Sequence, residues 1–256
     1  MIDTKTIFGV LTMKDKVRIF IGTSANGEDA EAEMTYEYSL RKNTEREIEI
    51  TWMKQTRDES SIWGGWQTQN WSTPFSGFRW AIPEACGFEG RAIYTDCDMI
   101  NFRDIGELLD TDLKGKPLAA RRGTRFGGHE FCVMVFDCKR FDDFAIPVAR
   151  MKKMPESHHR FIGAFSGNED LVEGLDPRWN CLDGENYAVD DIWHLHYTKM
   201  ASQPWQPDWF QGKAEVHARP ELVEMWLATR REASNAGYVS GNYIPKEPFG
   251  EYNIIG

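Results

Sequence analysis

Hydrophobic and polar positions follow two different periods in the first fifth of the chain. Residues 17–21 are apolar apart from Arg18 and are followed by Gly22, and residues 47–53 alternate apolar with polar side chains, so both segments are predicted to be strands. Between them, residues 28–42 carry apolar side chains at helical spacing, which predicts a helix. A strand, a helix and a second strand with short connections indicate an α/β sheet.

The same patterns predict further elements along the chain. Strands are expected at 91–95, 117–120, 131–136 and 193–197, and helices at 76–86 and 220–236. The last helix has Pro220 in its first turn and Gly237 directly after its end, as helix boundaries favour. No repeat and no shift in composition divides the chain, so we expect this helix to pack on a single α/β domain.

A long segment without a predicted element, residues 54–73, is rich in tryptophan. It contains Trp63, Trp66 and Trp71, with Gly64 and Gly65 between the first two. Loops of this length are usually functional, and paired glycines give a backbone unusual freedom. One interpretation is a lid that closes over a binding site. The other is that the tryptophans simply pack in a small core of their own.

Composition and charge exclude several classes of protein. The 256 residues hold 30 Lys and Arg against 40 Asp and Glu, a formal net charge of −10, which disfavours general nucleic-acid binding. No apolar run reaches the ~18 residues of a membrane span. The apolar stretch 7–13 lacks the flanks of a secretory signal. Five cysteines without a Cys-x-x-Cys pair indicate neither a disulfide framework nor a cysteine zinc site, so a cytoplasmic location is expected.

Two Asp-x-Asp triplets are the first candidates for chemistry. Asp96 and Asp98 follow the predicted strand 91–95 directly, whereas Asp110 and Asp112 lie in a polar segment and are expected to form a solvated turn. Ligands of open α/β sheets bind at the carboxyl ends of strands, where two carboxylates aimed together suit Mg²⁺ or Mn²⁺. The alternative is that the pair caps a turn. The triplet alone is weak evidence, because a chain rich in aspartate contains such triplets by chance.

Histidines occur in two pairs. His194 and His196 are spaced to share one face of the predicted strand 193–197, and such a pair is either a set of metal ligands or structural. His158 and His159 are adjacent, stand beside a basic stretch, and are expected at the solvated surface.

Taken together, these segments resemble GT-A fold nucleotide-sugar glycosyltransferases of the family 8 type. The most specific matches are TDCDMI at 95–100 and the late His196 with Pro204 and Trp205. The matching stretches occur in the family's order: 17–24, 75–83, 91–100, 131–138, 176–182 and 196–205. The resemblance implies an α/β fold of the GT-A type, with a Rossmann-like, mixed and mostly parallel sheet flanked by helices.

The resemblance also implies an organisation and a set of site residues. Residues 1–212 are the glycosyltransferase domain, with a nucleotide-sugar-binding core at about 17–136 and an acceptor side at about 137–212. Residues 213–256 are a helix and tail on that domain. Metal binding falls on Asp96, Asp98 and His196, and donor binding on Thr23, Ser24, Arg79 and Asp96. Catalytic roles fall on Asp98 and, more loosely, on Glu169 and Asp170 as sugar-contacting carboxylates, while Asn180 is expected to be architectural or near the acceptor.

One stretch departs from the family's pattern. The family reads His-x-x-Gly-x-x-Lys-Pro-Trp, whereas here His196 and Trp205 are one residue further apart, and the glycine is absent. Gln203 stands in place of the phosphate-binding lysine. Either Lys199 supplies the missing charge or the diphosphate is held more weakly. The resemblance favours retention of anomeric configuration, while inversion needs a general base, for which Glu169 or Asp170 is the candidate.

The expected function is therefore that of a hexosyltransferase-type enzyme that uses Mn²⁺ or Mg²⁺. It would move a sugar from a nucleotide-diphosphate sugar, with UDP-sugars favoured, to a hydroxyl of a carbohydrate acceptor, as in polysaccharide biosynthesis. One alternative is a non-catalytic protein that binds carbohydrate or nucleotide-sugar on the same fold. The other is a metal-dependent phosphohydrolase, although Ile100 replaces the threonine that Asp-x-Asp-x-Thr phosphatases carry. Assembly into a homo-oligomer is left open.

Overall fold

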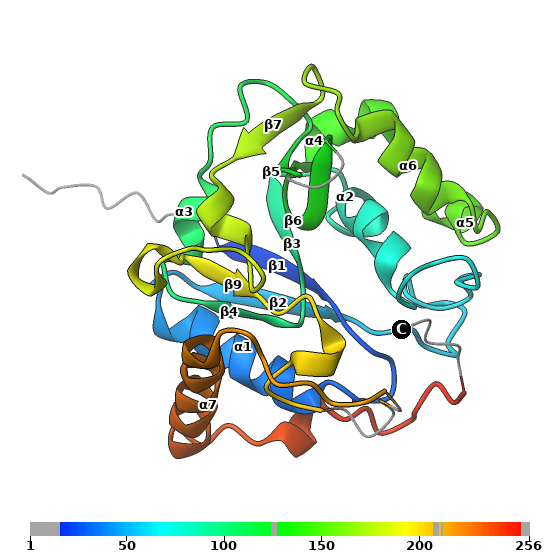
Figure 1. The fold of residues 1–256 in the computed structure, drawn as a ribbon. Coiled ribbons are helices and arrows are strands. Elements are labelled where there is room, and N and C mark those ends of the chain that lie inside the picture. The colour runs from blue at the N-terminus through cyan, green and yellow to red at the C-terminus, as the bar shows by residue number, and fades with distance from the viewer. Residues whose placement is uncertain (1–15, 124–126, 207–209, 211, 252–256) are drawn as a thin grey trace, which may run out of the picture.

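A mixed six-stranded sheet forms the centre of the molecule (Figure 1). The computed structural model describes residues 16–123, 127–206, 210 and 212–251, so the apolar stretch 7–13 lies outside the described residues. The strand order is β2-β1-β3-β6-β5-β7. The pairs β1–β2, β1–β3 and β5–β7 are parallel, and β6 runs antiparallel to β3 and β5. The strands are β1 (Val17–Gly22), β2 (Ile48–Met53), β3 (Arg91–Asp96), β5 (Leu118–Arg122), β6 (His129–Asp137) and β7 (Val172–Leu175).

Helices cover both faces of this sheet, and each face has its own apolar cluster (Figure 1). One cluster joins β3 and β6 to Phe141, Phe161 and Phe165, and the other joins β1 to Tyr36 and Leu40. The α-helices are α1 (Ala30–Lys42), α2 (Ile82–Ala85), α3 (Ile105–Leu109), α4 (Cys138–Phe141), α5 (Val148–Met151), α6 (Ser157–Phe165) and α7 (Pro220–Asn235). This is the predicted fold class, an α/β sheet flanked by helices.

A second, smaller sheet controls the geometry at the end of β3. It has the order β4-β9-β8 and consists of β4 (Met99–Asn101), β8 (Cys181–Leu182) and β9 (His194–His196). Two residues separate the end of β3 from the start of β4, and β4 pairs antiparallel with β9, with Met99 opposite His196. The register therefore brings residues just after β3 next to the end of β9.

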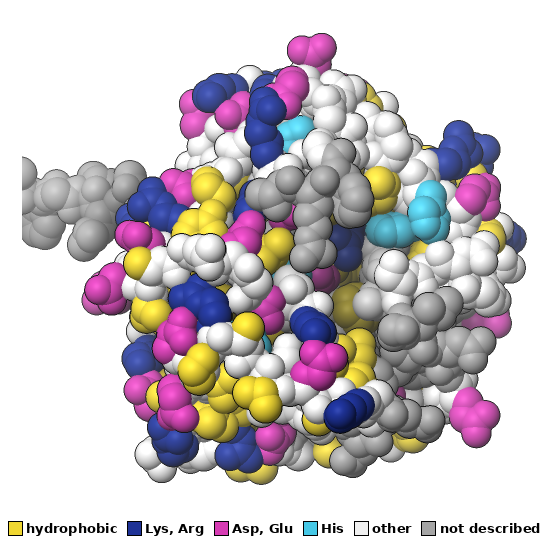
Figure 2. All heavy atoms as spheres, viewed as in Figure 1, with side chains coloured by type: hydrophobic (Ala, Val, Ile, Leu, Met, Phe, Trp, Pro, Cys, Tyr) yellow, Lys and Arg dark blue, Asp and Glu magenta, His cyan; other side chains and the backbone are white. Residues whose placement is uncertain are grey.

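The last helix packs on the first. In α7, Leu222 and Trp226 are buried in an apolar cluster with Leu195 and Trp205, and Arg230 forms an ion pair with Glu31 of α1 at 2.6 Å. Within the described residues, no helix combines the length and apolar character that crossing a membrane requires. Acidic and basic side chains are interspersed over the face drawn in Figure 2.

The observed elements follow the predicted ones closely, apart from the segment 76–86. A 3₁₀ helix at Ser76–Ala81 leads there into the short α2, and Pro83 lies in the first turn of α2. A Cβ at Gly77 would lie 2.3 Å from Trp71, so the chain turns tightly against this ring. Short elements without a clear period were not predicted; they include α6, β4, β7 and β8.

The tryptophan-rich loop is packed, and the lid interpretation is wrong for its tryptophans. Trp63, Trp66 and Trp71 are at most 9% exposed and contact Phe78. The indole N–H groups of Trp66 and Trp71 donate to backbone carbonyls at 2.8 and 2.9 Å. A Cβ at Gly64 would lie 1.9 Å from the carbonyl oxygen of Asp58, so this glycine permits close packing and is not a hinge.

Candidate active site

A cavity of about 360 Å³ lies at the carboxyl ends of β1 and β3. Ser24 after β1 and Asp96 and Asp98 around the end of β3 line it. Arg79 of the 3₁₀ helix and Gln203, which were also predicted site residues, line the same cavity. Open α/β sheets bind their ligands at this edge, because the loops after neighbouring strands converge there.

Asp98 and His196 meet inside this region. The β4–β9 pairing brings His196 Nε2 to 3.2 Å from Asp98 Oδ1, and the backbone N–H of Tyr197 donates to the Asp98 carbonyl at 3.0 Å. On the other side of the ring, Nδ1 donates to Asn180 Oδ1 at 3.1 Å. An amide oxygen only accepts, so Nδ1 carries a hydrogen and Nε2 is the ring nitrogen that faces the carboxylate.

The carboxylate oxygen that faces this ring lacks an ordinary partner. Asp98 Oδ1 is buried and has no hydrogen-bond partner among the described residues. Burial lowers the pKa of His196, but the Asp98 carboxylate outweighs burial and raises it overall. A divalent cation fits between the two groups, because Nε2 of a neutral ring offers a lone pair and Asp98 Oδ1 offers a carboxylate oxygen.

Asp96 lies in a different environment from Asp98. Its Oδ1 is 3.4 Å from Arg79 Nη2 and accepts a hydrogen bond from the Tyr94 hydroxyl. Arg79 is buried, stacks over the Tyr94 ring at 4.3 Å, and donates to the carbonyls of Ser76 and Phe131. Burial raises the pKa of Asp96, and the Arg79 charge opposes this. Arg79 is thus a fixed positive charge in the cavity wall.

A third carboxylate makes the cavity acidic. Asp29, just before α1, also lines the cavity, and burial raises its pKa to about 6. Against Asp29, Asp96 and Asp98, the described lining offers the single guanidinium of Arg79. Carboxylates repel a diphosphate, so an anionic ligand at this edge needs a cation to bridge it to the acidic side chains.

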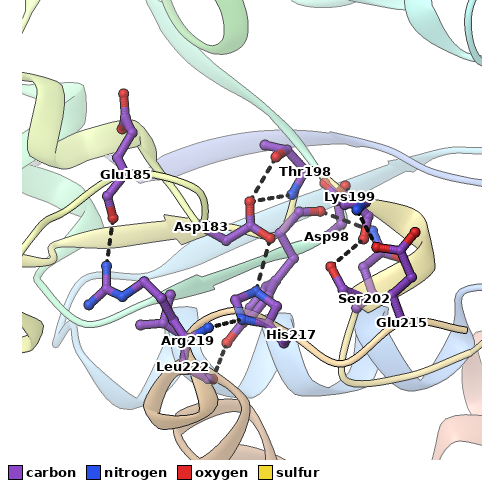
Figure 3. A network of polar contacts seen from close by, with 12 residues as sticks. Asp98, Asp183, Glu185, Thr198, Lys199, Ser202, Glu215, His217, Arg219 and Leu222 are labelled. Atoms are coloured by element: carbon purple, nitrogen blue, oxygen red, sulfur yellow. Dashed lines mark hydrogen bonds and ion pairs between the residues drawn. The ribbon is translucent and has the colours of Figure 1, made fainter.

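Gln203 lies in the cavity lining, whereas Lys199 does not. The Gln203 amide donates to Asp98 Oδ2 at 3.4 Å and to the Tyr197 carbonyl at 3.0 Å. Lys199 is exposed and forms an ion pair with Glu215 (Figure 3). The prediction that Lys199 supplies the missing phosphate-binding charge is therefore not supported by its position, because its ammonium group is paired outside the cavity.

A buried polar network holds the chain after β9 in place (Figure 3). Asp183 Oδ1 accepts from the backbone and hydroxyl of Thr198 at 3.1 and 2.7 Å. The ring of His217 contacts Asp183 Oδ2 through Nε2 at 3.1 Å, and its Nδ1 accepts from the backbone of Arg219 at 3.0 Å. The segment before α7 thereby fixes the turn that follows His196, and no sequence pattern predicted this contact.

Three of the predicted site residues, Thr23, Glu169 and Asp170, lie outside the cavity lining. Thr23 is buried with its hydroxyl donating to Glu33 at 2.7 Å, so it faces α1, while Ser24 lines the cavity. Glu169 and Asp170 are exposed residues in the turn before β7, and neither lines the cavity. Glu169 pairs there with Arg122, which makes it a surface ion pair and not a positioned base.

In each histidine pair, the two residues lie in different environments. His194 is fully buried between the Tyr36 hydroxyl at 2.9 Å and the Trp179 carbonyl at 3.0 Å, outside the cavity, and burial lowers its pKa to about 3. His158, expected at the surface, instead lines the cavity with Nδ1 accepting from Trp80 at 3.0 Å. That expectation was wrong because the helical period of α6 was not recognised. His159 is exposed, as expected.

A second cavity, of about 490 Å³, adjoins the first at β6. Cys132 and His129 of β6 line both cavities, while His196 and Glu185 line only the second. The Asp98–His196 pair thus stands between two hollows. His129 lies in none of the matching stretches, and Cys132 lies in the stretch 131–138 but was given no role there, so only the three-dimensional arrangement identifies them.

Comparisons with known proteins address the fold. No family model matches the sequence. The chain is 27% identical to the protein CDI of Arabidopsis thaliana over 246 residues, which cover 87% of this chain and 92% of that protein.

Three solved structures illustrate the likeness. The galactosyltransferase LgtC, solved in complex with donor and acceptor sugar analogs, is 13% identical with a TM-score of 0.58, covering 84% of this chain and 96% of LgtC. The glycosyltransferase GlyE of Streptococcus pneumoniae TIGR4 is 17% identical with a TM-score of 0.59, covering 88% and 64%. The bifunctional glycosyltransferase WbbM is 12% identical with a TM-score of 0.59, and this chain spans about half of it, 52%. The chain therefore has the GT-A fold, and the predicted resemblance is confirmed at the level of the fold.

Proposed function

We propose that this protein is a metal-dependent glycosyltransferase that moves a sugar from a nucleotide-diphosphate sugar, with UDP-sugars favoured, to a hydroxyl of a carbohydrate acceptor. The observation that carries the proposal is the meeting of Asp96, Asp98 and His196 at the carboxyl edge of a GT-A sheet, with a buried carboxylate oxygen that lacks a partner. Fold alone does not decide an activity, and it is this site that supports one.

Asp96, Asp98 and His196 are the residues that would hold Mn²⁺ or Mg²⁺. The ion would neutralise the negative charge that develops on the diphosphate as it leaves the sugar. It also explains how an anionic donor binds among three carboxylates, as the described lining contains no lysine and only one arginine. Asn180 orients His196, and Gln203 orients Asp98 through its amide.

The remaining groups of the cavity bind and position the donor. Arg79 is buried in the cavity wall, where water screens its charge only weakly. It therefore attracts the diphosphate more strongly than an exposed lysine would. Ser24 offers its hydroxyl just after the carboxyl end of β1. As negative charge develops on the diphosphate, these fixed groups stabilise it without having to reorganise.

We place the acceptor in the second cavity. It is separated from the donor cavity by Cys132 and His196, so a hydroxyl entering from that side approaches the region of the cation. Glu130 and Glu185 line it and offer carboxylate oxygens to sugar hydroxyls. Both halves of the predicted division, about 17–136 and about 137–212, contribute residues to each cavity.

The test is to incubate the protein with a panel of nucleotide-diphosphate sugars and to measure released nucleoside diphosphate with and without Mn²⁺. A transferase releases it slowly by donor hydrolysis and faster with an acceptor. Inorganic phosphate as the product would instead identify a phosphohydrolase.

A non-catalytic binding protein would give a third result. The nucleoside diphosphate with Mn²⁺ would raise the melting temperature, because a ligand that binds only the folded state stabilises it. No donor would be consumed. Gln203 in place of lysine is the feature that favours this alternative, and Asp98→Ala is the control that should abolish release in the transferase.

A further inference from the structure

Cys132 places a sulfur atom beside the proposed cation ligands. It lies in β6, next to β3, and its thiol contacts the Asp96 carboxylate. The ligand atoms of Asp96, Cys132 and His196 all lie within 4.8 Å of one another. These three residues come from three different strands, β3, β6 and β9.

This spacing is close to that of ligands around one ion. Atoms bound to a single Zn²⁺, at about 2.0–2.3 Å each, lie about 3–4 Å apart, so a small contraction brings the three atoms to one centre. Asp98 Oδ1, 3.2 Å from His196 Nε2, is a further candidate atom outside this group of three. With it, the set would be two carboxylate oxygens, one imidazole nitrogen and one sulfur.

A sulfur in the set changes which ions the site prefers. Mg²⁺ and Mn²⁺ prefer oxygen ligands, whereas Zn²⁺ and Co²⁺ accept thiolate, imidazole and carboxylate together. Four protein ligands also complete a tetrahedral zinc shell and leave no open position for a diphosphate. A thiolate ligand therefore does not help Mg²⁺ or Mn²⁺ to bind a diphosphate at this site.

Of the other cysteines, Cys97 is the one that also lines the donor cavity. It is buried between Asp96 and Asp98 along the chain, and the charges of Asp29 and Glu33, on the α1 side, act on it together with that of Asp98. It is not among the atoms that gather around Asp96 and His196. Cys132 is thus the thiol that faces the cation site.

We propose that Cys132 is a ligand for thiophilic divalent cations, and that with Asp96, Asp98 and His196 it forms a site at which Zn²⁺ or Co²⁺ displaces Mn²⁺ and blocks the nucleotide-sugar. The proposal rests on the cation site of the proposed function. On binding, the Cys132 thiol releases its proton to solvent and its sulfur donates an electron pair to the cation. Zn²⁺ then acts as an inhibitor that competes with Mn²⁺.

The experiment uses Co²⁺ as a spectroscopic probe on the full chain. Thiolate bound to Co²⁺ gives a sulfur-to-metal charge-transfer band in the near ultraviolet, which oxygen and nitrogen ligands do not give. We expect this band in the wild-type protein, its loss in Cys132→Ser, and its retention in Cys86→Ser. Cys86 is the matched control, a half-buried cysteine outside both cavities.

Competition titrations then measure the ion preference. Cys132→Ser should weaken Zn²⁺ binding about tenfold or more, the usual cost of disturbing a metal centre, and leave Mn²⁺ binding within about twofold. Melting curves check that both variants fold. A band that persists in Cys132→Ser, or is absent from the wild type, overturns the proposal.

The outcome is separable from that of the proposed function. If the band appears but neither Mn²⁺ with nucleoside diphosphate stabilises the fold nor donor is consumed, the thiol site stands and glycosyl transfer fails. If nucleoside diphosphate with Mn²⁺ binds but the band is absent, transfer stands and the thiol ligand is refuted.

Discussion

The two Asp-x-Asp triplets have the same spacing but opposite environments. Asp96 and Asp98 follow a buried strand and face Arg79 and His196 inside a cavity. Asp110 and Asp112 end a short helix at the surface, where Asp110 pairs with Arg46 at 3.0 Å and Asp112 accepts from the backbone of Lys114 at 2.9 Å.

The difference shows what turns a pair of carboxylates into a site. At the surface, water and local hydrogen bonds satisfy the oxygens, so such a pair has no need of a ligand. In the cavity, Asp98 Oδ1 is shielded from water, has no hydrogen bond among the described residues, and faces the His196 ring at 3.2 Å. A buried carboxylate oxygen without a donor is costly, and a cation bound between it and His196 would offset that cost.

The most direct way to break this comparison is Asp98→Ala set against Asp112→Ala. We expect Asp98→Ala to lower sugar transfer by about 10²–10³-fold, the loss typical when one group that stabilises transition-state charge is removed. It should also remove the Mn²⁺-dependent rise in melting temperature with nucleoside diphosphate. Asp112→Ala should be near neutral in both measurements. Equal damage from the two variants would mean that the wrong triplet was assigned.

His196→Ala set against His194→Ala sharpens the comparison. His196 faces Asp98, whereas His194 is enclosed by Tyr36 and Trp179. We expect His196→Ala to weaken Mn²⁺ binding about 10–100-fold or more, because the loss of a residue that only supports a metal ligand already has a cost of that size. His194→Ala should lower the melting temperature and leave the affinity of the folded protein for Mn²⁺ unchanged. Calorimetric titration measures the affinities, and identical values for the two variants would contradict the assignment.

The first triplet was identifiable from sequence because its evidence is local. An apolar run followed directly by Asp96 and Asp98 predicts a strand and its end, and the structure has β3 there. The role of His196 is different, since it depends on the antiparallel pairing of β4 with β9. Nothing in the spacing shows that pairing, and only the resemblance to a family indicated it.

Other features had no sequence signal at all. Asp29 and Cys132 enter the site because α1 and β6 pack against β3, and no local pattern marked either residue for the site. The tryptophans of residues 54–73 looked like a mobile loop because the pattern shows no period, whereas long-range contacts with Phe78 bury them. Local periodicity thus predicted the strands and the main helices, but not what packs against them.

A pH-dependent test concerns the crowding of carboxylates around the first triplet. Burial, with smaller contributions from Asp98 and Glu28, raises the pKa of Asp29 from 3.8 to about 6. The folded chain therefore favours the protonated form, and the stability that this form gives is full below pH 3.8 and is lost as the pH rises through 6.

Asp29→Asn should remove this dependence, because the amide stays neutral. We expect the variant to be more stable than the wild type by about 2–3 kcal/mol at pH 8, without metal, and about equal to it at pH 3.5. Urea unfolding at the two pH values measures the difference, and Asp112→Asn is the exposed control. A gain of the same size at both pH values would show that packing and not charge is responsible.

The smallest expected effect belongs to the second triplet. Asp110 is exposed, and its ion pair with Arg46 is one of several contacts of that arginine, which also donates to the Gly106 carbonyl at 3.2 Å. Surface ion pairs contribute little, because water screens the charges and the side chains lose freedom. We therefore expect Asp110→Ala to lower the free energy of unfolding by less than about 1 kcal/mol and to leave nucleotide binding intact. High salt should reduce even this difference, since it screens exposed charges and leaves the buried first triplet largely unaffected. Urea unfolding at low and high salt measures it, and a loss of several kcal/mol that salt does not change would mean that the second triplet is also a buried, structural site.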